Sequence, residues 1–199
     1  MSIKVIGFQT MQAELKKALA EFVGQNKAVT IGIHEEAGDV EGGDMTMAKL
    51  GAIHEYGASI DHPGGTSYGY ATAKAANQGK VRFLKTGAGY MQLGVTSAHK
   101  ITIPARPWLK PGVESGTQEY LAIVQSKIAA GANIDAVLEE IGVVAAGIVQ
   151  KYMTDLKSPP NAKSTIRQKG SSNPLIASGA LRASVTYALQ KDRPTEGLE

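Results

Sequence analysis

The side chains of this chain that could do chemistry are histidines, carboxylates and serines, because its 199 residues include no cysteine. His54 and Glu55 match the opening of the helical motif of zinc proteases. That motif needs a second histidine four residues after the first, so that both imidazoles reach one metal. Position 58 is an alanine. We therefore interpret His54 and Glu55 as the end of a partly buried helix and predict no metal site there.

A second group of candidate ligands is a run of five carboxylates: Glu35, Glu36, Asp39, Glu41 and Asp44. Calcium takes oxygen ligands at regular spacing around a bend that glycine makes possible. Glycines interrupt the run, but the spacing of the carboxylates matches no EF-hand. The run predicts a solvated acidic loop.

The remaining patterns do not assemble a catalytic group. No serine stands in a Gly-x-Ser-x-Gly turn, and Gly87–Gly89 lacks the Lys-Ser/Thr that completes a phosphate-binding loop. The histidines, at positions 34, 54, 62 and 99, are scattered along the chain. We therefore expect a protein without catalysis and without a cofactor. A hydrolase is an alternative function that stays open.

Basic residues gather near the C-terminus. Six of them and no acid lie between Asp155 and Asp192, while the whole chain has a formal net charge of only +3. The tract 157–191 could place Lys and Arg on phosphates, which makes a DNA-contacting accessory protein the alternative function. It lacks the interleaved aromatic residues that stack on single-stranded bases. We favour contact with an acidic protein surface.

The composition and the length of the chain limit the kinds of fold that it can adopt. A hydrophobic content of 43% is enough for a packed core, and the length is typical of one domain. No apolar run approaches the roughly 18 residues that span a bilayer, and residues 1–7 lack the apolar region of a signal peptide. We expect no membrane partner.

The order of periodic segments predicts an α+β fold. A small, mainly antiparallel sheet would pack against an N-terminal helix at about 9–24 and a long antiparallel helix pair at about 111–130 and 134–156. Further expected elements are strands near 3–5, 29–33, 100–104 and 185–189, and a short helix at about 46–57. We expect a single domain, 1–199, with a turn-rich β insertion at about 58–99, including strands near 80–84 and 90–95, and a mobile basic loop at about 157–178.

Four stretches of the sequence resemble, in the same order, the virion morphogenesis proteins of tailed bacteriophages. The longest match is the C-terminal signature, with Pro-Pro-Asn at 159–161, Ser-Thr-Ile at 164–166, Lys-Gly-Ser-Ser-Asn-Pro-Leu-Ile at 169–176 and Gly-Ala-Leu-Arg-Ala-Ser-Val at 179–185. The others are Ala-Lys-Leu-Gly-Ala-Ile-His-Glu-Tyr-Gly at 48–57, Ile-Pro-Ala-Arg-Pro-Trp-Leu at 103–109 and Ile-Gly at 141–142, which opens a helix ending at Tyr152. The resemblance covers about residues 27–190. One departure is Ala177-Ser178, where the family more often has Asp-Thr.

The resemblance implies a structural virion protein of the head–tail junction, a neck or tail-completion subunit that joins the tail to the head connector. It implies a homo-oligomeric ring, expected to have six copies, with the connector or stopper and the tail terminator or tail tube as partners, and possible transient DNA contact in the lumen. The implied location is the virion, after assembly in the host cytoplasm.

Candidate residues for protein interfaces follow from side-chain type. Arg106 and Trp108 allow two readings: an interface anchor, or a turn with Trp108 in the core and Arg106 bonded to backbone carbonyls. The other candidates lie on the C-terminal stretch, which we interpret as a docking arm: Lys163, Arg167, Lys169, Leu175 and Arg182.

Overall fold

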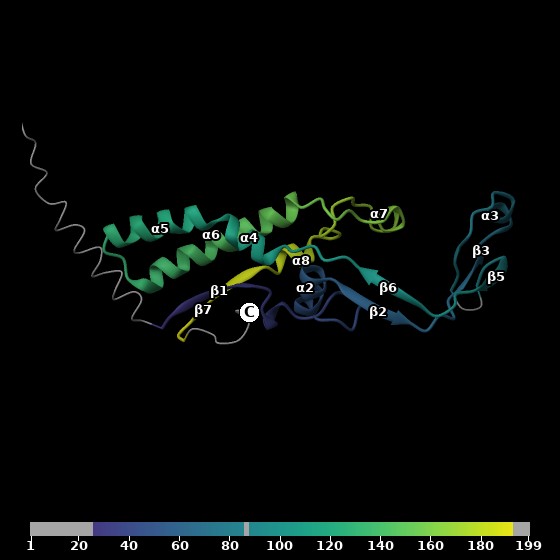
Figure 1. Cartoon of the computed structure of the whole chain (residues 1–199), viewed down its shortest axis with the longest axis horizontal. Helices are drawn as coiled ribbons and strands as arrows, with labels where there is room; N and C mark the ends of the chain where they lie inside the picture. The colour runs from purple at the N-terminus through teal and green to yellow at the C-terminus, as the bar shows by residue number, and fades with distance from the viewer. Residues whose placement is uncertain (1–25, 86–87, 193–199) are drawn as a thin grey trace, which may run out of the picture. The chain divides into compact units, whose positions relative to one another are not determined.

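The chain folds into two compact units, which Figure 1 shows in a computed structural model describing residues 26–85 and 88–192. Unit 1 comprises Met1–Tyr56 and Ala105–Glu199, and unit 2 is Gly57–Pro104. We expected one domain with an insertion at about 58–99, and the structure gives the segment 57–104 as a unit of its own. The strand near 3–5 and the helix at about 9–24 lie outside the described residues.

Unit 1 is built on a two-stranded sheet and a long helix. Strand β1 (Ala28–Gly32) pairs antiparallel with β7 (Thr186–Gln190), which joins the first and last described strands of the chain. Helix α6 (Ile134–Asp155) packs on both strands, and α5 (Thr117–Ala129) runs beside α6 in the opposite direction. The expected antiparallel helix pair is confirmed by this arrangement (Figure 1).

The ends of α6 follow from its sequence. Asn133 caps the first turn by accepting a hydrogen bond of 2.9 Å from the backbone N–H of Ala136. The apolar residues that recur at helical spacing are buried, among them Val137, Val149 and Met153. The helix ends before two consecutive prolines, at 159 and 160, which cannot continue it.

The other predicted long helix is interrupted. Residues 109–129 form two helices, α4 (Leu109–Ser115) and α5, with Gly116 between them. A Cβ atom at Gly116 would stand 2.3 Å from the Tyr120 hydroxyl and 2.7 Å from Ile148 Cδ1, so the bend depends on a close approach that only glycine permits.

The core of unit 1 lies where its short elements meet α6. Helix α2 (Met47–Tyr56), the 3-10 turn η1 (Glu35–Ala37) and helix α8 (Ala180–Ala183) supply or flank it. The buried cluster contains residues from all parts of the unit: Met47, Trp108, Val149, Met153, Leu175, Leu181 and Val185.

Unit 2 consists of small antiparallel sheets. Strand β2 (Ala58–His62) pairs with β6 (His99–Ile103), and a three-stranded sheet has the order β4 (Arg82–Phe83), β3 (Ser67–Tyr70), β5 (Met91–Val95). A short helix, α3 (Ala73–Asn77), was not predicted; Thr72 caps it.

The α+β class predicted from the sequence is confirmed. Helices and separate antiparallel sheets account for the regular structure of the described residues. The sheet is divided into three small ones, where a single sheet was expected.

Candidate functional site: a buried framework beneath a basic segment

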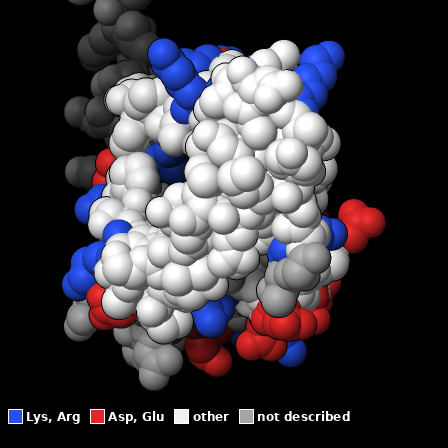
Figure 2. Space-filling view, turned by 90° about the vertical axis from the view of Figure 1, so that its right-hand side faces the viewer, with Lys and Arg blue, Asp and Glu red and all other residues white. Residues whose placement is uncertain are grey.

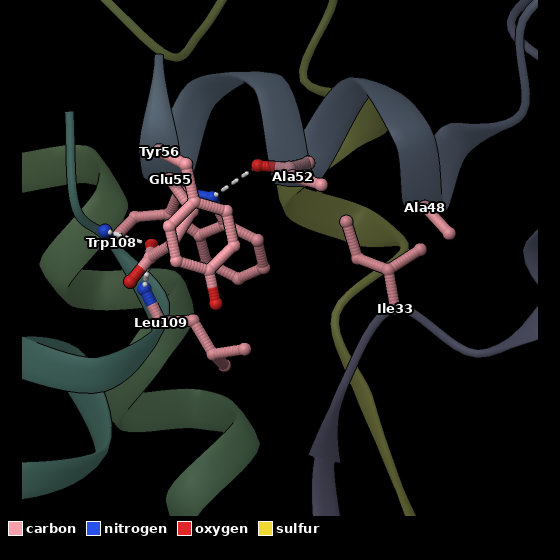
Figure 3. A pocket seen from close by; sticks show the side chains of 8 residues that line it. Ile33, Ala48, Ala52, Glu55, Tyr56, Trp108 and Leu109 are labelled. Carbon is pink, nitrogen blue, oxygen red and sulfur yellow. Dashed lines mark hydrogen bonds between the residues drawn. The ribbon is translucent and has the colours of Figure 1, made fainter. Parts of the chain in front are cut away.

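The centre of the site is Glu55, a carboxylate at the end of α2 that caps the start of α4. Its Oε2 accepts hydrogen bonds from the backbone N–H groups of Trp108 (2.6 Å) and Leu109 (2.8 Å), and its Oε1 accepts one from Lys110 (3.3 Å). The side chain is only 8% exposed. A carboxylate placed on the free N–H groups of a helix start satisfies them and complements the helix dipole (Figure 3).

Trp108, which directly precedes α4, also holds α2 to the start of that helix. Its indole N–H donates to the carbonyl of Gly51 over 3.0 Å, and its side chain is 2% exposed. A Cβ atom at Gly51 would lie 2.8 Å from Ile33 Cδ1 and 3.2 Å from Trp108 Cζ2. The Gly51 of the family-like stretch is therefore needed for the close packing of the indole.

Arg106 joins the framework to the C-terminal stretch. Its Nε donates to the carbonyl of Pro159 (2.8 Å), and its Nη2 donates to the carbonyl of Pro160 (3.2 Å) and to Asn161 Oδ1 (3.3 Å). The side chain is 5% exposed, and no carboxylate of the described residues lies within ion-pair distance of it. Burial lowers the pKa of Arg106. Backbone oxygens stabilise this guanidinium.

His54 lies close to Arg106 and has an unusual environment. The carbonyl of His54 accepts a 2.7 Å hydrogen bond from the backbone N–H of Arg106, while its own buried Nδ1 has no hydrogen-bond partner among the described residues. Desolvation, and then the charges of Arg106 and Lys169, lower the pKa of His54. The imidazole is therefore neutral at pH 7.

The C-terminal stretch is held to the body of unit 1 through Asn173. Its side-chain amide donates to the carbonyl of Thr154 (2.8 Å), and its Oδ1 accepts from the backbone N–H groups of Leu175 (2.9 Å) and Ile176 (3.1 Å). Lys169 donates to the carbonyl of Asn173 over 2.6 Å. This is an Asx-type turn of the kind that Asn-Pro sequences favour.

We call residues 157–182 the basic segment. The sequence indicated a mobile loop at about 157–178, whereas the structure contains a helix there, α7 (Lys163–Lys169), which ends at Gly170 in the left-handed conformation. With Arg106 bonded to 159–161 and Asn173 bonded to α6, both sides of α7 are attached to the core.

The structure places the candidate interface residues in three environments. Three of them are buried: Arg106, Trp108 and Leu175. Of the two interpretations of Arg106 and Trp108, the structure agrees with the one that puts Trp108 in the core and bonds Arg106 to backbone carbonyls. Lys169 and Arg182 are partly buried, and Arg182 donates to Thr154 Oγ1 over 3.2 Å. Lys163 and Arg167 are exposed and form no ion pair with the described residues.

A small apolar hollow of about 150 Å³ adjoins the framework. Gly51, Trp108 and Leu109 line one part of it and Ile33 and Ala48 another, and Figure 3 shows Ile33 and Ala48 away from the Glu55 carboxylate. The ring of Tyr56, also at the hollow, is 79% exposed. Its lining is mainly apolar, and its volume is below the roughly 300–1,000 Å³ of ordinary small-molecule pockets.

Two residues of the framework were not recognised in the sequence as functional. In the sequence, Glu55 stands in a rejected metal motif, at a helix end and in the family-like stretch 48–57, and Asn173 stands in the family signature alone. The Asn-Pro pair at 173–174 was the local signal for a turn, but the capping role of Glu55 needs α4 to start beside it in space.

Residues 26–85 and 88–192 contain neither a metal site nor a membrane-spanning helix. No three side chains of the metal-ligating kind gather there closely enough to hold an ion. In the same ranges, no helix combines the length and apolar character needed to cross a membrane.

Fold and site define a small α+β protein with a rigid framework, an attached basic segment and a separate β unit. Comparisons with protein-family models, curated proteins and solved structures found no match to this chain.

Proposed function

We propose that this chain is a structural subunit of the bacteriophage head–tail junction, a neck or tail-completion protein without catalysis. It assembles into a ring of identical copies, six by the family resemblance, and joins the tail to the head connector.

The arrangement of the family-like stretches supports this proposal. The stretch 48–57 holds the stretch 103–109 through Glu55 and Trp108, and Arg106 of the latter holds Pro159–Asn161. Gln150, on the helix α6 that contains Ile141-Gly142, donates to the carbonyl of Val185 over 3.0 Å. Three of the four sequence matches thus meet in one framework, as expected if they belong to one ancestral structure.

The observation that carries the assembly role is the apolar surface of unit 2. No apolar side chain of the unit is among the buried ones, and eight large apolar residues are exposed: Ile60, Val81, Phe83, Tyr90, Met91, Leu93, Val95 and Ile101. Figure 2 shows that the end of the unit carrying α3, β3 and β5 is largely free of charged side chains. Small sheets without a core are marginal alone, and exposed apolar side chains in this number on one unit support a protein–protein contact there.

The test is assembly and joining in vitro. Mass photometry of the purified protein, alone and with tail tubes, should detect rings or tube-bound rings, and adding the protein to separated heads and tails should yield joined particles. A Phe83→Ser/Leu93→Ser variant should lose joining, while Lys74→Ser/Lys80→Ser, two exposed polar changes in the same unit, should retain it. Failure of the wild-type protein to bind either heads or tails would refute the function.

The alternative, a DNA-contacting accessory protein, is favoured only by the exposed Lys163 and Arg167. Phosphate contacts would make affinity for duplex DNA fall with a log–log salt slope of about −0.9 per neutralised phosphate. A slope of about −2 or steeper that a Lys163→Ala/Arg167→Ala variant flattens would support direct DNA contact.

A further inference from the structure

We propose that the basic segment of one copy binds the acidic loop of a second copy, the loop being residues 35–44. This inference rests on the ring assembly of the proposed function and assigns its subunit contact. The occupant of the basic surface is a second copy of this chain, through charge complementarity.

The basic surface is preformed. Lys163 and Arg167 lie four residues apart on α7, which places them on the same face of the helix. Both side chains are exposed, and neither is paired with a carboxylate of the described residues. The bonds of Arg106 and Asn173 to the chain on either side of α7 hold it in place, so binding costs little ordering of the backbone.

The acidic loop is preformed as well. Backbone hydrogen bonds link Val40 N–H to the carbonyl of Met45 (2.8 Å) and Met47 N–H to the carbonyl of Gly38 (2.9 Å), and residues 39 and 46 form a β-bridge. All five carboxylates of the loop are exposed, and none pairs with a cation in the part of the chain that the structure describes. Five like charges held close together repel one another, and a cationic partner relieves this repulsion.

Within one copy the two charged surfaces do not meet. Both belong to unit 1, and in Figure 1 α7 lies on one side of α2 while η1, which begins the acidic loop, lies on the other. A contact that joins two different patches of identical copies is heterologous, and such a contact closes into a ring when its rotation allows. The pair of patches therefore fits a ring contact.

The acidic loop is flanked in sequence by two residues that line the apolar hollow. Ile33 precedes the loop, Ala48 follows it, and both line the hollow described above, beside the exposed ring of Tyr56. A charged rim around an apolar seat is the usual composition of a specific protein interface. The rim makes assembly sensitive to salt, because exposed charge pairs are screened.

Charge reversal with mutual rescue tests the contact. The basic-reversed variant is Lys163→Glu/Arg167→Glu, the acid-reversed variant is Glu35→Lys/Glu36→Lys, and the control is Lys191→Glu, an exposed lysine of unit 1 outside both patches. Each variant is followed by mass photometry and sedimentation at low and high salt, with and without tail tubes. Far-ultraviolet circular dichroism and Trp108 fluorescence verify the fold.

We expect each reversed variant alone to assemble at least about 100-fold more weakly than wild type, since like charges across an interface cost several kcal/mol and each 1.4 kcal/mol is tenfold. A mixture of the two reversed variants restores complementary patches and should assemble within about tenfold of wild type. The control variant should assemble like wild type.

Several outcomes would overturn the inference. These are reversed variants that assemble like wild type, a mixture that restores nothing, and a wild-type protein that stays monomeric with and without tail tubes. Loss of head or tail binding with self-assembly intact would assign the surface to another protein. Rescued self-assembly without head–tail joining would uphold the contact and refute the proposed function, which keeps the two failures distinct.

Discussion

The substitution Glu55→Gln tests the framework most directly, because it keeps the shape of the side chain and removes only its charge. The carboxylate accepts three backbone N–H groups at the start of α4, from Trp108, Leu109 and Lys110. A glutamine retains one oxygen and turns an N–H₂ group toward the third donor. A hydrogen bond to a charged group contributes about 1.5–3 kcal/mol, against about 0.5–1.5 for a neutral one.

The expected loss is the sum of two effects. Two bonds that become neutral lose about 1 kcal/mol each, and a buried N–H left facing another donor costs about 1–3 kcal/mol more. We therefore expect Glu55→Gln to lower the free energy of unfolding by about 3–5 kcal/mol. With an m-value of about 2 kcal/mol/M in urea, the midpoint moves down by about 1.5–2.5 M.

The assay is urea unfolding followed by tryptophan fluorescence at neutral pH. Trp108 is the only tryptophan of the chain and donates its backbone N–H to Glu55, so the signal reports the unit that contains the site. The control is Glu114→Gln, an exposed carboxylate in the same short helix, expected to change stability by less than about 0.5 kcal/mol. Equal midpoints for the two variants would refute the capping role of Glu55.

Two further predictions concern stability. Gly142→Ala should destabilise unit 1 by about 1–3 kcal/mol, because its Cβ would stand 2.3 Å from the ring of Tyr187. Gly147→Ala in the same helix has open space around it and should stabilise the unit by up to about 1 kcal/mol. Thermal unfolding of the two variants measures both shifts, and equal shifts would contradict the prediction. His54 has a pKa lowered by folding, so its contribution is complete above its unfolded value of about 6.5 and is lost as the pH falls below that value. His54→Gln should therefore lose less stability than wild type between about pH 8 and about pH 5 in urea unfolding, and a slope unchanged by His54→Gln would exclude the buried neutral imidazole.

The elements that the sequence predicted well are those whose pattern is local. Helix α6 combines an Asn cap, apolar residues at helical spacing and a Pro-Pro stop, and each of these acts within a few residues of chain. Strands β1 and β7 lie within one residue of their predicted ranges and pair antiparallel, with α6 packed on both. These predictions were confirmed to within a few residues.

The features that the sequence did not predict depend on contacts between distant segments. Between α4 and α5, Gly116 packs closely against Tyr120 and against Ile148 of the distant helix α6, and the helical sequence pattern continues through this break. The basic segment has the Pro, Gly and Ser content of a mobile loop, yet Arg106 and Asn173 hold its ends. Composition measures the intrinsic freedom of such a segment and takes no account of hydrogen bonds supplied by the rest of the fold.

The two buried charges of the framework have a common consequence. Glu55 and Arg106 form no ion pair with each other, because each is satisfied by backbone groups of a different segment. They stand just before and just after unit 2 in sequence, and a backbone hydrogen bond from Arg106 to His54 joins the two positions within unit 1. The framework therefore fixes both points at which the chain leaves and re-enters unit 1, and through Pro159 it fixes the start of the basic segment as well. In the ring subunit proposed above, this attachment would favour contacts of the charged segment, since a contact made on rigid backbone loses less entropy than one made on a free loop.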